Sequence, residues 1–416
     1  MKSKVFISLI ALVLCGAVML CFTGCTTTVG AVDLCKGLTK GNVKGLPVDD
    51  TFAFKQMDFS TELFKSVLES KKGENVMVSP LSVYVALSIL TNGADGETLE
   101  ELESVLAGGN DITKHNEYLY TYLNGLKSTK KAKFNNSNSI WLKEDGDFVA
   151  KKEFLQKNVD YYGADIFKSP FNEDTVKDVN NWVKDKTDGD IDKMLDKVDP
   201  NDVMYIINAL TFDAEWKEKY KEAAVRDGRF TSYSKEEKTV TMMHSTENSY
   251  IEMDNATGFI KPYKENYSLA VLLPDMDVDV YDFVSQLDSK TLRTAINGAK
   301  ETEVLAAIPK FGFDSEMELK QTLAEMGMPS AFDGFKANFS RVSECPTFVS
   351  SVFQKTRIDV SAKGTKAGAA TTIIVTLRGE PSVERKSVIC DRPFVFMIID
   401  NAEKLPIFMG VVADAE

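Results

Sequence analysis

The sequence contains little of what most enzymes place at a reacting centre. Its 416 residues include only two histidines, His115 and His244, which stand in unrelated contexts. No G-x-S-x-G, H-E-x-x-H or glycine-rich phosphate-binding motif is present. The carboxylates are numerous but show no spacing that pairs them. We therefore expect a protein that is not an enzyme and has neither metal nor cofactor, although two distant histidines can still meet in a folded chain.

Cysteine is also scarce in the part of the chain that we expect to fold. Three of the six cysteines lie within the first 25 residues, and the others are widely spaced: Cys35, Cys345 and Cys390. An odd number of distant cysteines fits neither a disulfide framework nor a metal-binding motif. We expect Cys345 and Cys390 to be buried free thiols.

Basic residues are outnumbered by acidic ones, and the formal net charge is −13. Nucleic acids and anionic membrane surfaces attract basic patches, so this charge argues against both as partners. With 44% hydrophobic and 27% charged residues, the composition is that of a globular protein. About 390 residues follow the amino-terminal segment, which is enough for two ordinary domains or one large one.

Residues 1–24 form a targeting segment. Lys2 and Lys4 supply its positive start, residues 5–19 are nearly all apolar, and a small residue directly precedes Cys25. The ending resembles a bacterial lipoprotein signal, in which Cys25 becomes the lipidated first residue of a protein on the cell surface. An ordinary cleaved signal, which would give a secreted protein, is the alternative. The apolar run is too short and interrupted to predict a membrane span.

The rest of the chain divides into a tether and a folded domain. Residues 25–50 are rich in glycine, threonine and lysine without periodicity, which predicts a flexible tether. The folded domain is expected at 51–416. Helical periodicity marks the apolar face of its first helix, formed by Phe59, Leu63, Phe64, Val67 and Leu68.

The most unusual stretch is GTKAGAATTIIVTLR, residues 364–378. Alternate positions from Thr365 onward are small or apolar, which is typical of a strand that buries one side. Its small residues would let it enter between existing strands without overpacking. An exposed turn is predicted at 377–381. From these residues alone, a plain edge strand followed by a hairpin is the simpler interpretation.

Longer motifs, in the same order along the chain, resemble those of the serpin family. They are NVMVSPLSVYVALSILTNGADGETLEEL, VNNWVKDKTDGDIDKML, INALTFDAEWKEKY, VSSVFQKTRIDVSAKGTKAGAAT and DRPFVFMIIDNAEKLPIFMGVVAD. The resemblance covers about residues 52 to 414. It implies the α+β serpin fold, with a large central mixed β-sheet, further sheets, about eight or nine helices and an exposed reactive-centre loop. It also implies a monomer.

The resemblance implies a function for the unusual stretch. In inhibitory serpins the residue before the scissile bond lies fourteen after the hinge glycine, which from Gly364 gives Arg378, followed by Gly379. The chain would then be an irreversible suicide inhibitor of trypsin-like serine proteases, which become its covalent partners. The alternatives are a non-inhibitory serpin that binds or carries a ligand, an inhibitor of an Arg-specific cysteine protease, and a surface-exposed enzyme.

The same resemblance assigns the residues that would move. The hinge comprises Gly364, Thr365, Lys366, Ala367, Gly368, Ala369, Ala370 and Thr371. Trp216 would lie where the loop first enters the sheet. A polar cluster beneath the opening strands would comprise Ser79, Ser82, Asn208 and Gln354.

Two features depart from the family pattern. The family usually has acidic residues at the positions of Ala362 and Lys366, and a histidine at the position of Gln354. The glutamine puts the usual hydrogen bonds of the polar cluster in doubt. Thr365 falls in the inward register and Lys366 in the outward one, where its charge can stay in water. We therefore expect a competent hinge that tolerates Lys366→Glu.

Overall fold

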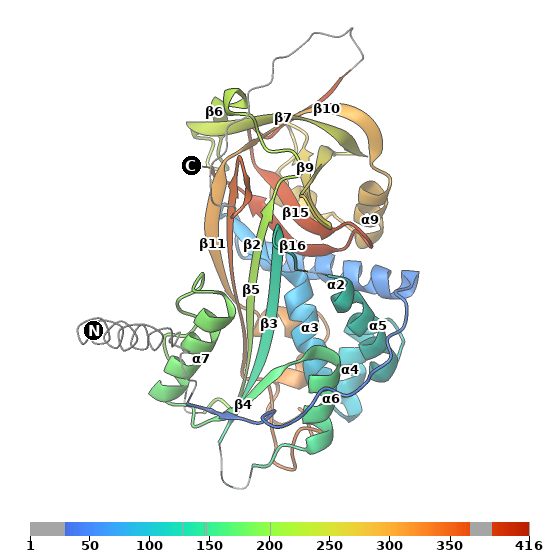
Figure 1. Ribbon diagram of the computed structural model, residues 1–416, viewed down its shortest axis with the longest axis vertical. Coiled ribbons are helices and arrows are strands. Elements are labelled where there is room, and N and C mark those ends of the chain that lie inside the picture. The colour runs from blue at the N-terminus through green and yellow to red at the C-terminus, as the bar shows by residue number, and fades with distance from the viewer. Residues whose placement is uncertain are drawn as a thin grey trace, which may run out of the picture.

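The computed structural model describes residues 30–126, 128–144, 146, 148–199, 201–366 and 385–415. These residues form nine α-helices and two large β-sheets, drawn in Figure 1. The predicted α+β fold with a large central mixed sheet and eight or nine helices is therefore confirmed. None of the helices in the described ranges is long and apolar enough to cross a membrane.

The central sheet has seven strands and is mixed, because the pairs β3–β4 and β5–β12 are parallel whereas its other pairs are antiparallel. From one edge to the other its strands are β1 (Val32–Asp33), β4 (Asp165–Ser169), β3 (Ala132–Lys143), β5 (Met204–Glu215), β13 (Gly364–Thr365), β12 (Ser351–Ser361) and β11 (Phe311–Glu318).

The second sheet has nine strands. Its order is β14 (Lys386–Ile389), β10 (Lys300–Pro309), β7 (Glu237–Met253), β8 (Ala256–Pro262), β9 (Tyr267–Pro274), β15 (Phe394–Asp400), β16 (Pro406–Val412) and β2 (Val76–Val78), with β6 (Val225–Thr231) beside β7. Every residue of β9, β15 and β16 is buried. A Cβ added at Gly410 would lie 2.4 Å from the ring of Phe396 in β15 and 2.6 Å from the backbone oxygen of Val76 in β2, so no larger residue fits at this position.

The helices cover both faces of the central sheet. Figure 1 shows α3 to α6 on one side of it and α7 on the other. Their bounds are α2 (Asp50–Glu69), α3 (Pro80–Thr91), α4 (Gly96–Leu106), α5 (Ile112–Gly125), α6 (Lys152–Tyr162), α7 (Glu173–Lys186), α8 (Val280–Ser285), α9 (Ser289–Asn297) and α10 (Lys320–Glu325), with short 3₁₀ turns at Glu222–Ala224 and Pro329–Phe332. The predicted apolar face of α2 is buried throughout, as helical periodicity requires.

Strand β5 contributes side chains to the cores on both faces of the central sheet, because successive side chains of a strand point to opposite faces. One set packs into the main core beneath α3, and the other packs into a smaller core beneath α7. The first set is Ile206, Leu210, Phe212 and Ala214, and the second is Tyr205, Ile207 and Ala209. Asn208 falls in the first set, so its amide points into the main core.

The segment predicted as a flexible tether lies against the domain over residues 30–49. Val32 and Asp33 form β1, which adds an edge strand to β4. Farther on, the N–H of Gly41 donates to Asp160 at 2.7 Å, and the N–H of Leu46 donates to the carbonyl of Glu117 at 3.1 Å. A composition rich in glycine, threonine and lysine without periodicity suggested a tether, but backbone hydrogen bonds hold residues 30–49 against the domain.

The three described cysteines are free. Cys390 is buried, as predicted, and burial raises the pKa of its thiol. Cys345 is only half-buried, so that prediction was wrong for it. Its N–H donates to the hydroxyl of Ser343, two residues earlier, at 3.2 Å, in a segment outside the regular elements.

The two histidines do not meet. His244 lies in β7 opposite Ala307 of β10. His115 lies in α5, fully buried, with Nε2 2.8 Å from the hydroxyl of Ser88 on α3. Burial lowers the pKa of His115 from an ordinary value of 6.5 to about 4, so the folded protein holds this ring neutral.

This burial predicts an acid sensitivity. Because the unfolded chain binds a proton on His115 at higher pH than the folded chain does, the free energy of unfolding should fall as pH drops from about 6.5 to about 4, by on the order of 3 kcal/mol. His115→Gln should flatten this dependence, measured by urea unfolding across that range. His244→Gln is the control, because that ring is only half-buried. Identical pH profiles for wild type and His115→Gln would contradict the assignment.

Candidate functional site

Strands β5 and β12 are neighbours that pair along only part of their length. Their parallel register ends with Lys355 opposite Ala209. Beyond that point, residues 210–213 of β5 and 356–359 of β12 are not paired with each other in the described structure. Farther along, β13 lies between the two strands. We call the unpaired stretch, residues 210–213 and 356–359, the sheet opening.

Strand β13 consists of the first two residues of the predicted hinge. It is antiparallel to both neighbours, with Thr365 opposite Ala214 and Val360. A Cβ added at Gly364 would lie 2.1 Å from the carbonyl oxygen of Ala214, so only glycine fits. The side chain of Thr365 points inward, is 2% exposed, and has its hydroxyl 2.6 Å from that of Tyr263. The hinge is thus seated in the sheet at two positions.

Trp216 lies beside this seated hinge. Its indole stacks on Tyr263, with ring centroids 4.3 Å apart and planes 9° from parallel. The indole N–H donates to the carbonyl oxygen of Ser361 at 2.8 Å, and the backbone N–H donates to the carbonyl of Lys363 at 3.1 Å. Trp216 therefore holds the turn that leads from β12 into the hinge.

A buried ion pair supports the aromatic group. The ammonium of Lys261 lies 2.7 Å from the carboxylate of Glu247, and the two side chains are 2% and 7% exposed. The same ammonium lies 4.4 Å from the ring centroid of Tyr220 and 5.4 Å from that of Trp216. Burial, and then the charge of Glu247, raise the pKa of Tyr220. Removing either charge would leave the other buried without its partner, which typically costs about 3–5 kcal/mol.

A row of amides crosses the sheet at the other end of the opening. Asn138 of β3, Asn208 of β5 and Gln354 of β12 lie opposite one another in register. The amide of Asn208 donates to Asn138 at 2.7 Å. Gln354 accepts from the N–H of Ser79 at 2.8 Å and donates to the carbonyl of Ser79 at 2.9 Å. Gln354 therefore ties β12 to the start of α3 through both halves of its amide.

Two polar atoms of the predicted polar cluster have no hydrogen-bond partner in the described residues. They are the hydroxyl of Ser82 and the Oδ1 of Asn208, on residues that are fully buried. Since buried polar groups are normally paired, each can gain a bond if the strands rearrange. Ser79 differs, because its hydroxyl caps α3 by accepting from the N–H of Ser82 at 3.3 Å and donates to the carbonyl of Ile407 at 2.8 Å.

Sequence reasoning missed some of the residues that build this site. Asn138 lies in the polar run NNSNS of β3, and polar residues in a strand could have indicated it. Tyr263 and Lys261 carry no such local signal. The remaining predicted positions lie outside the described residues: Ala367, Gly368, Ala369, Ala370 and Thr371 of the hinge, Arg378 and Gly379 of the reactive bond, and Cys25.

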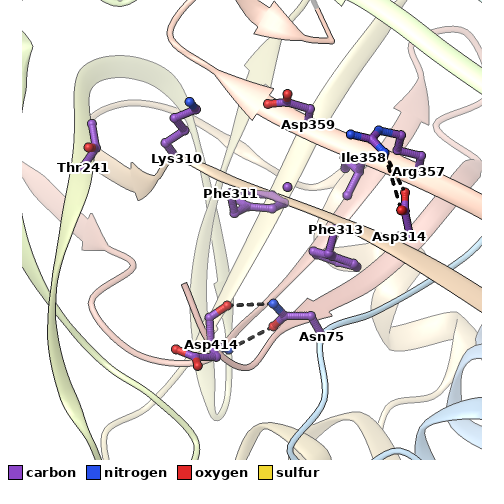
Figure 2. Close-up of a pocket in the computed structure, with 11 residues that line it drawn as sticks. Asn75, Thr241, Lys310, Phe311, Phe313, Asp314, Arg357, Ile358, Asp359 and Asp414 are labelled. Carbon is purple, nitrogen blue, oxygen red and sulfur yellow. Dashed lines mark hydrogen bonds and ion pairs between the residues drawn. The ribbon is translucent and has the colours of Figure 1, made fainter. Parts of the chain in front are cut away.

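A pocket of about 560 Å³ lies beside the sheet, between β11, β12 and the carboxy-terminal segment. Figure 2 shows Arg357 reaching Asp314, and the amide of Asn75 reaching the backbone of Asp414. None of the described residues that line it is a histidine, serine or cysteine. In the described ranges, no cluster of three or more histidine, cysteine or carboxylate side chains is arranged to hold a metal.

The comparisons with known proteins agree with this geometry. The chain matches the family model for "Serpin (serine protease inhibitor)" over residues 54–415, so it belongs to the serpin family. It is 29% identical over 375 residues to the leukocyte elastase inhibitor of Equus caballus, covering 85% of this chain and 96% of that protein.

Solved structures of a thermophilic serpin, tengpin, are also similar. The native-state structure is 44% identical, with a TM-score of 0.88, covering 92% of this chain and 99% of that one. The latent-state structure is 43% identical, with a TM-score of 0.77, covering 91% and 100%. The present fold is therefore more similar to the native-state structure.

The double hydrogen bond of Gln354 yields a stability prediction. Gln354→Leu would leave the N–H and carbonyl of Ser79 unpaired in a buried site, which should lower the free energy of unfolding by about 2–5 kcal/mol. Gln354→His, the residue usual in the family, keeps a donor and an acceptor and should lose less. Denaturant unfolding measures both. Wild-type stability of Gln354→Leu would mean that this contact does not hold β12 to α3.

Proposed function

We propose that this serpin is an irreversible suicide inhibitor of trypsin-like serine proteases, cut at the bond between Arg378 and Gly379. The observation that carries the proposal is the seated hinge beside the sheet opening. Strand β13 already occupies the first two positions of a new strand between β5 and β12. An arginine at the cut site suits a protease whose primary pocket carries an aspartate.

In this mechanism the target's serine attacks the carbonyl carbon of Arg378, and the amine of Gly379 leaves. The acyl-enzyme bond then links the protease to the end of the loop. Freed at its far end, the loop continues β13 along the sheet. Residues 365–378 in extended conformation span about 46 Å. The linked protease would be carried that distance and distorted before water completes the hydrolysis.

The row of amides supports this path, because extending the hinge strand in its present register brings a polar residue to that row. Thr365 lies opposite Ala214 and Val360. Continuing that register by six residues brings Thr371 between Asn208 and Gln354, on the inward face. A hydroxyl there could bond the orphaned oxygen of Asn208. The strands would exchange one set of polar contacts for another when they separate.

Incubation with trypsin, followed by denaturing electrophoresis, tests the proposal. We expect a stable covalent adduct with the wild-type chain and a new amino terminus at Gly379. Arg378→Ala should abolish the adduct without unfolding the protein, because the primary pocket loses its cation. Cleavage without an adduct would favour a non-inhibitory carrier. An adduct only with an Arg-specific cysteine protease would overturn the target class.

Thr365→Arg is the matched control for the insertion step. An arginine at this inward position must enter the interior or abandon β13, so insertion should slow while cleavage continues. The variant should be consumed as a substrate with little trapping. Trapping equal to wild type would mean that the loop does not act by insertion.

We further propose that Cys25 is lipidated and anchors the protein outside a bacterial cell. Because the segment from Gly30 onward lies on the domain, only residues 26–29 separate it from Cys25. A fully extended link of this length reaches roughly 18 Å. The domain would thus stand close to the membrane.

The sheet would set the orientation of the anchored protein. Strand β1 pairs with β4, and through β4 it lies level with Leu142 near one end of β3. Strand β13 pairs with β5, and through β5 it lies level with Ala132 at the other end of β3. Ala132 and Leu142 are ten positions apart on β3, which spans about 33 Å. The hinge would therefore face away from the membrane, toward arriving proteases.

Detergent phase partitioning tests the anchor. The mature wild-type protein should enter the detergent phase, and Cys25→Ser should release it into the aqueous phase, because two acyl chains bury many methylene groups. A water-soluble wild-type product that begins several residues after Cys25 would instead indicate plain secretion.

A further inference from the structure

Lys366 is the first residue after the two hinge residues that form β13 in the sheet. It directly follows β13, and its backbone φ of 56° lies in the left-handed region that is unfavourable for residues with a Cβ. Its N–H donates to the carbonyl oxygen of Asp359 at 2.6 Å. The amide is therefore bonded to the sheet, although the φ of Lys366 is not that of a strand. Extending β13 by one residue requires Lys366 to adopt an extended φ.

The side chain of Lys366 is held at this point by Asp190. The ammonium forms an ion pair with that carboxylate, and the two side chains are 37% and 21% exposed. A turn fixes Asp190, because its N–H donates to the carbonyl oxygen of Thr187 at 3.0 Å. Asp188 and Lys133 are further charged groups close to Lys366.

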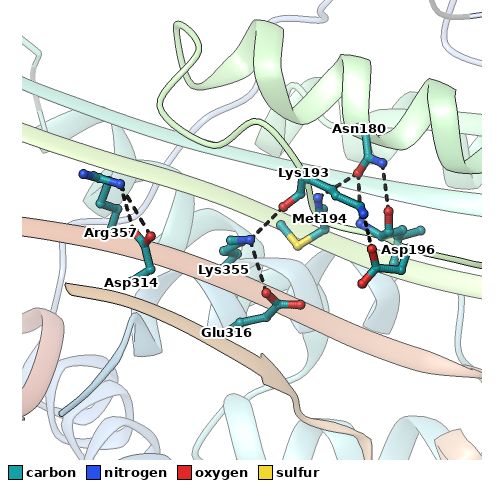
Figure 3. A network of polar contacts seen from close by, with 9 residues as sticks. Asn180, Lys193, Met194, Asp196, Asp314, Glu316, Lys355 and Arg357 are labelled. Atoms are coloured by element: carbon teal, nitrogen blue, oxygen red, sulfur yellow. Dashed lines mark hydrogen bonds and ion pairs between the residues drawn. The ribbon is translucent and has the colours of Figure 1, made fainter.

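Asp190 belongs to the connection between α7 and β5, which lies on the face of the central sheet. Ile191 and Leu195 of this connection pack with Ile207 of β5. Figure 3 shows the ammonium of Lys355, on β12, bonded to the carbonyl oxygen of Lys193 at 2.9 Å. The ion pair therefore links the hinge to a segment that is itself bonded to β12 and packed on β5.

A different pair of carboxylates flanks the next strand position. Because Thr365 lies opposite Ala214 and Val360, one further residue of β13 places Lys366 between Asp213 and Asp359. Directly opposed residues of neighbouring strands share a face, with Cβ atoms about 4.5–5.5 Å apart. Lys366 would thus exchange one acidic partner for two when the strand extends.

We propose that Asp190 positions the hinge by holding Lys366 where two residues are inserted, and that Asp213 and Asp359 receive the lysine when insertion proceeds. The inference deepens the proposed insertion mechanism and rests on it. It accounts for a lysine where an acidic residue is usual, since three carboxylates surround its path. Lys366→Glu, which the sequence alone suggested to be harmless, is therefore expected to slow insertion.

The holding role is tested on the intact protein without any protease. In ¹⁵N-lysine-labelled protein, Asp190→Asn should raise the hydrogen-exchange rate of the Lys366 amide about two- to fivefold, the range that a partly exposed ion pair supports. Asp192→Asn is the control, because Asp192 lies in the same connection and forms an ion pair with Lys184 of α7. Equal exchange rates in Asp190→Asn and Asp192→Asn would overturn the holding role.

The receiving role is tested by the rate of insertion after cleavage. Stopped-flow tryptophan fluorescence after mixing with trypsin should show insertion about two- to fivefold slower in the double variant Asp213→Asn, Asp359→Asn, and faster by a similar factor in Asp190→Asn. Unchanged rates in both variants would overturn the proposal. If wild type is cut without an adduct, the proposed function fails, whereas the exchange experiment still decides whether Asp190 holds the hinge.

Discussion

The feature on which the rest of the structure depends is a gap in strand pairing. Strands β5 and β12 are neighbours, but over the sheet opening they are not paired with each other. Over the sheet opening, each strand is paired with its outer neighbour, β3 or β11, and among the described residues only Gly364 and Thr365 form a strand between β5 and β12, beyond the end of the opening. Backbone groups are obligatory hydrogen-bonding groups, and each intramolecular bond contributes about 0.5–1.5 kcal/mol net. A segment that fills the opening gains such bonds along its whole length. That gain can power a mechanism in which the native fold is not the most stable one.

Polar contacts close the opening at both ends. At one end, the hydroxyls of Tyr263 and Thr365 meet beside the indole of Trp216. At the other end, the amide of Gln354 bonds to the backbone of Ser79. Separating apolar side chains would leave cavities, which are costly in a close-packed core. Hydrogen bonds can instead be passed to the backbone and hydroxyls of an incoming strand. Polar contacts at the two ends of the opening therefore suit the proposed mechanism, in which they break when a strand enters.

The contacts of Gln354 and Lys366 explain how these two residues, which depart from the family pattern, fit at their positions. An imidazole in its neutral form has one donor and one acceptor, and the amide of Gln354 supplies both to Ser79. At the hinge, Lys366 is paired with Asp190, and Asp213 and Asp359 flank the next strand position. Gln354 therefore matches its neighbours in hydrogen-bonding capacity, and Lys366 matches them in charge. Such matches are visible only when distant segments are brought together.

The sequence by itself determined the elements whose signal is local. The apolar face of α2 repeats at helical spacing, and serpin motifs in family order identified the fold and the position of the hinge. Tertiary structure decided the rest, because the decisive contacts join residues far apart in the chain. Tyr263 and Thr365 are separated by 102 positions, and no periodicity relates Asp190 to Lys366. The segment at residues 30–49 had the composition of a tether, yet β1 is held by backbone groups that every residue carries. Side-chain patterns report which face of an element is buried, but only the folded chain decides which partner covers it.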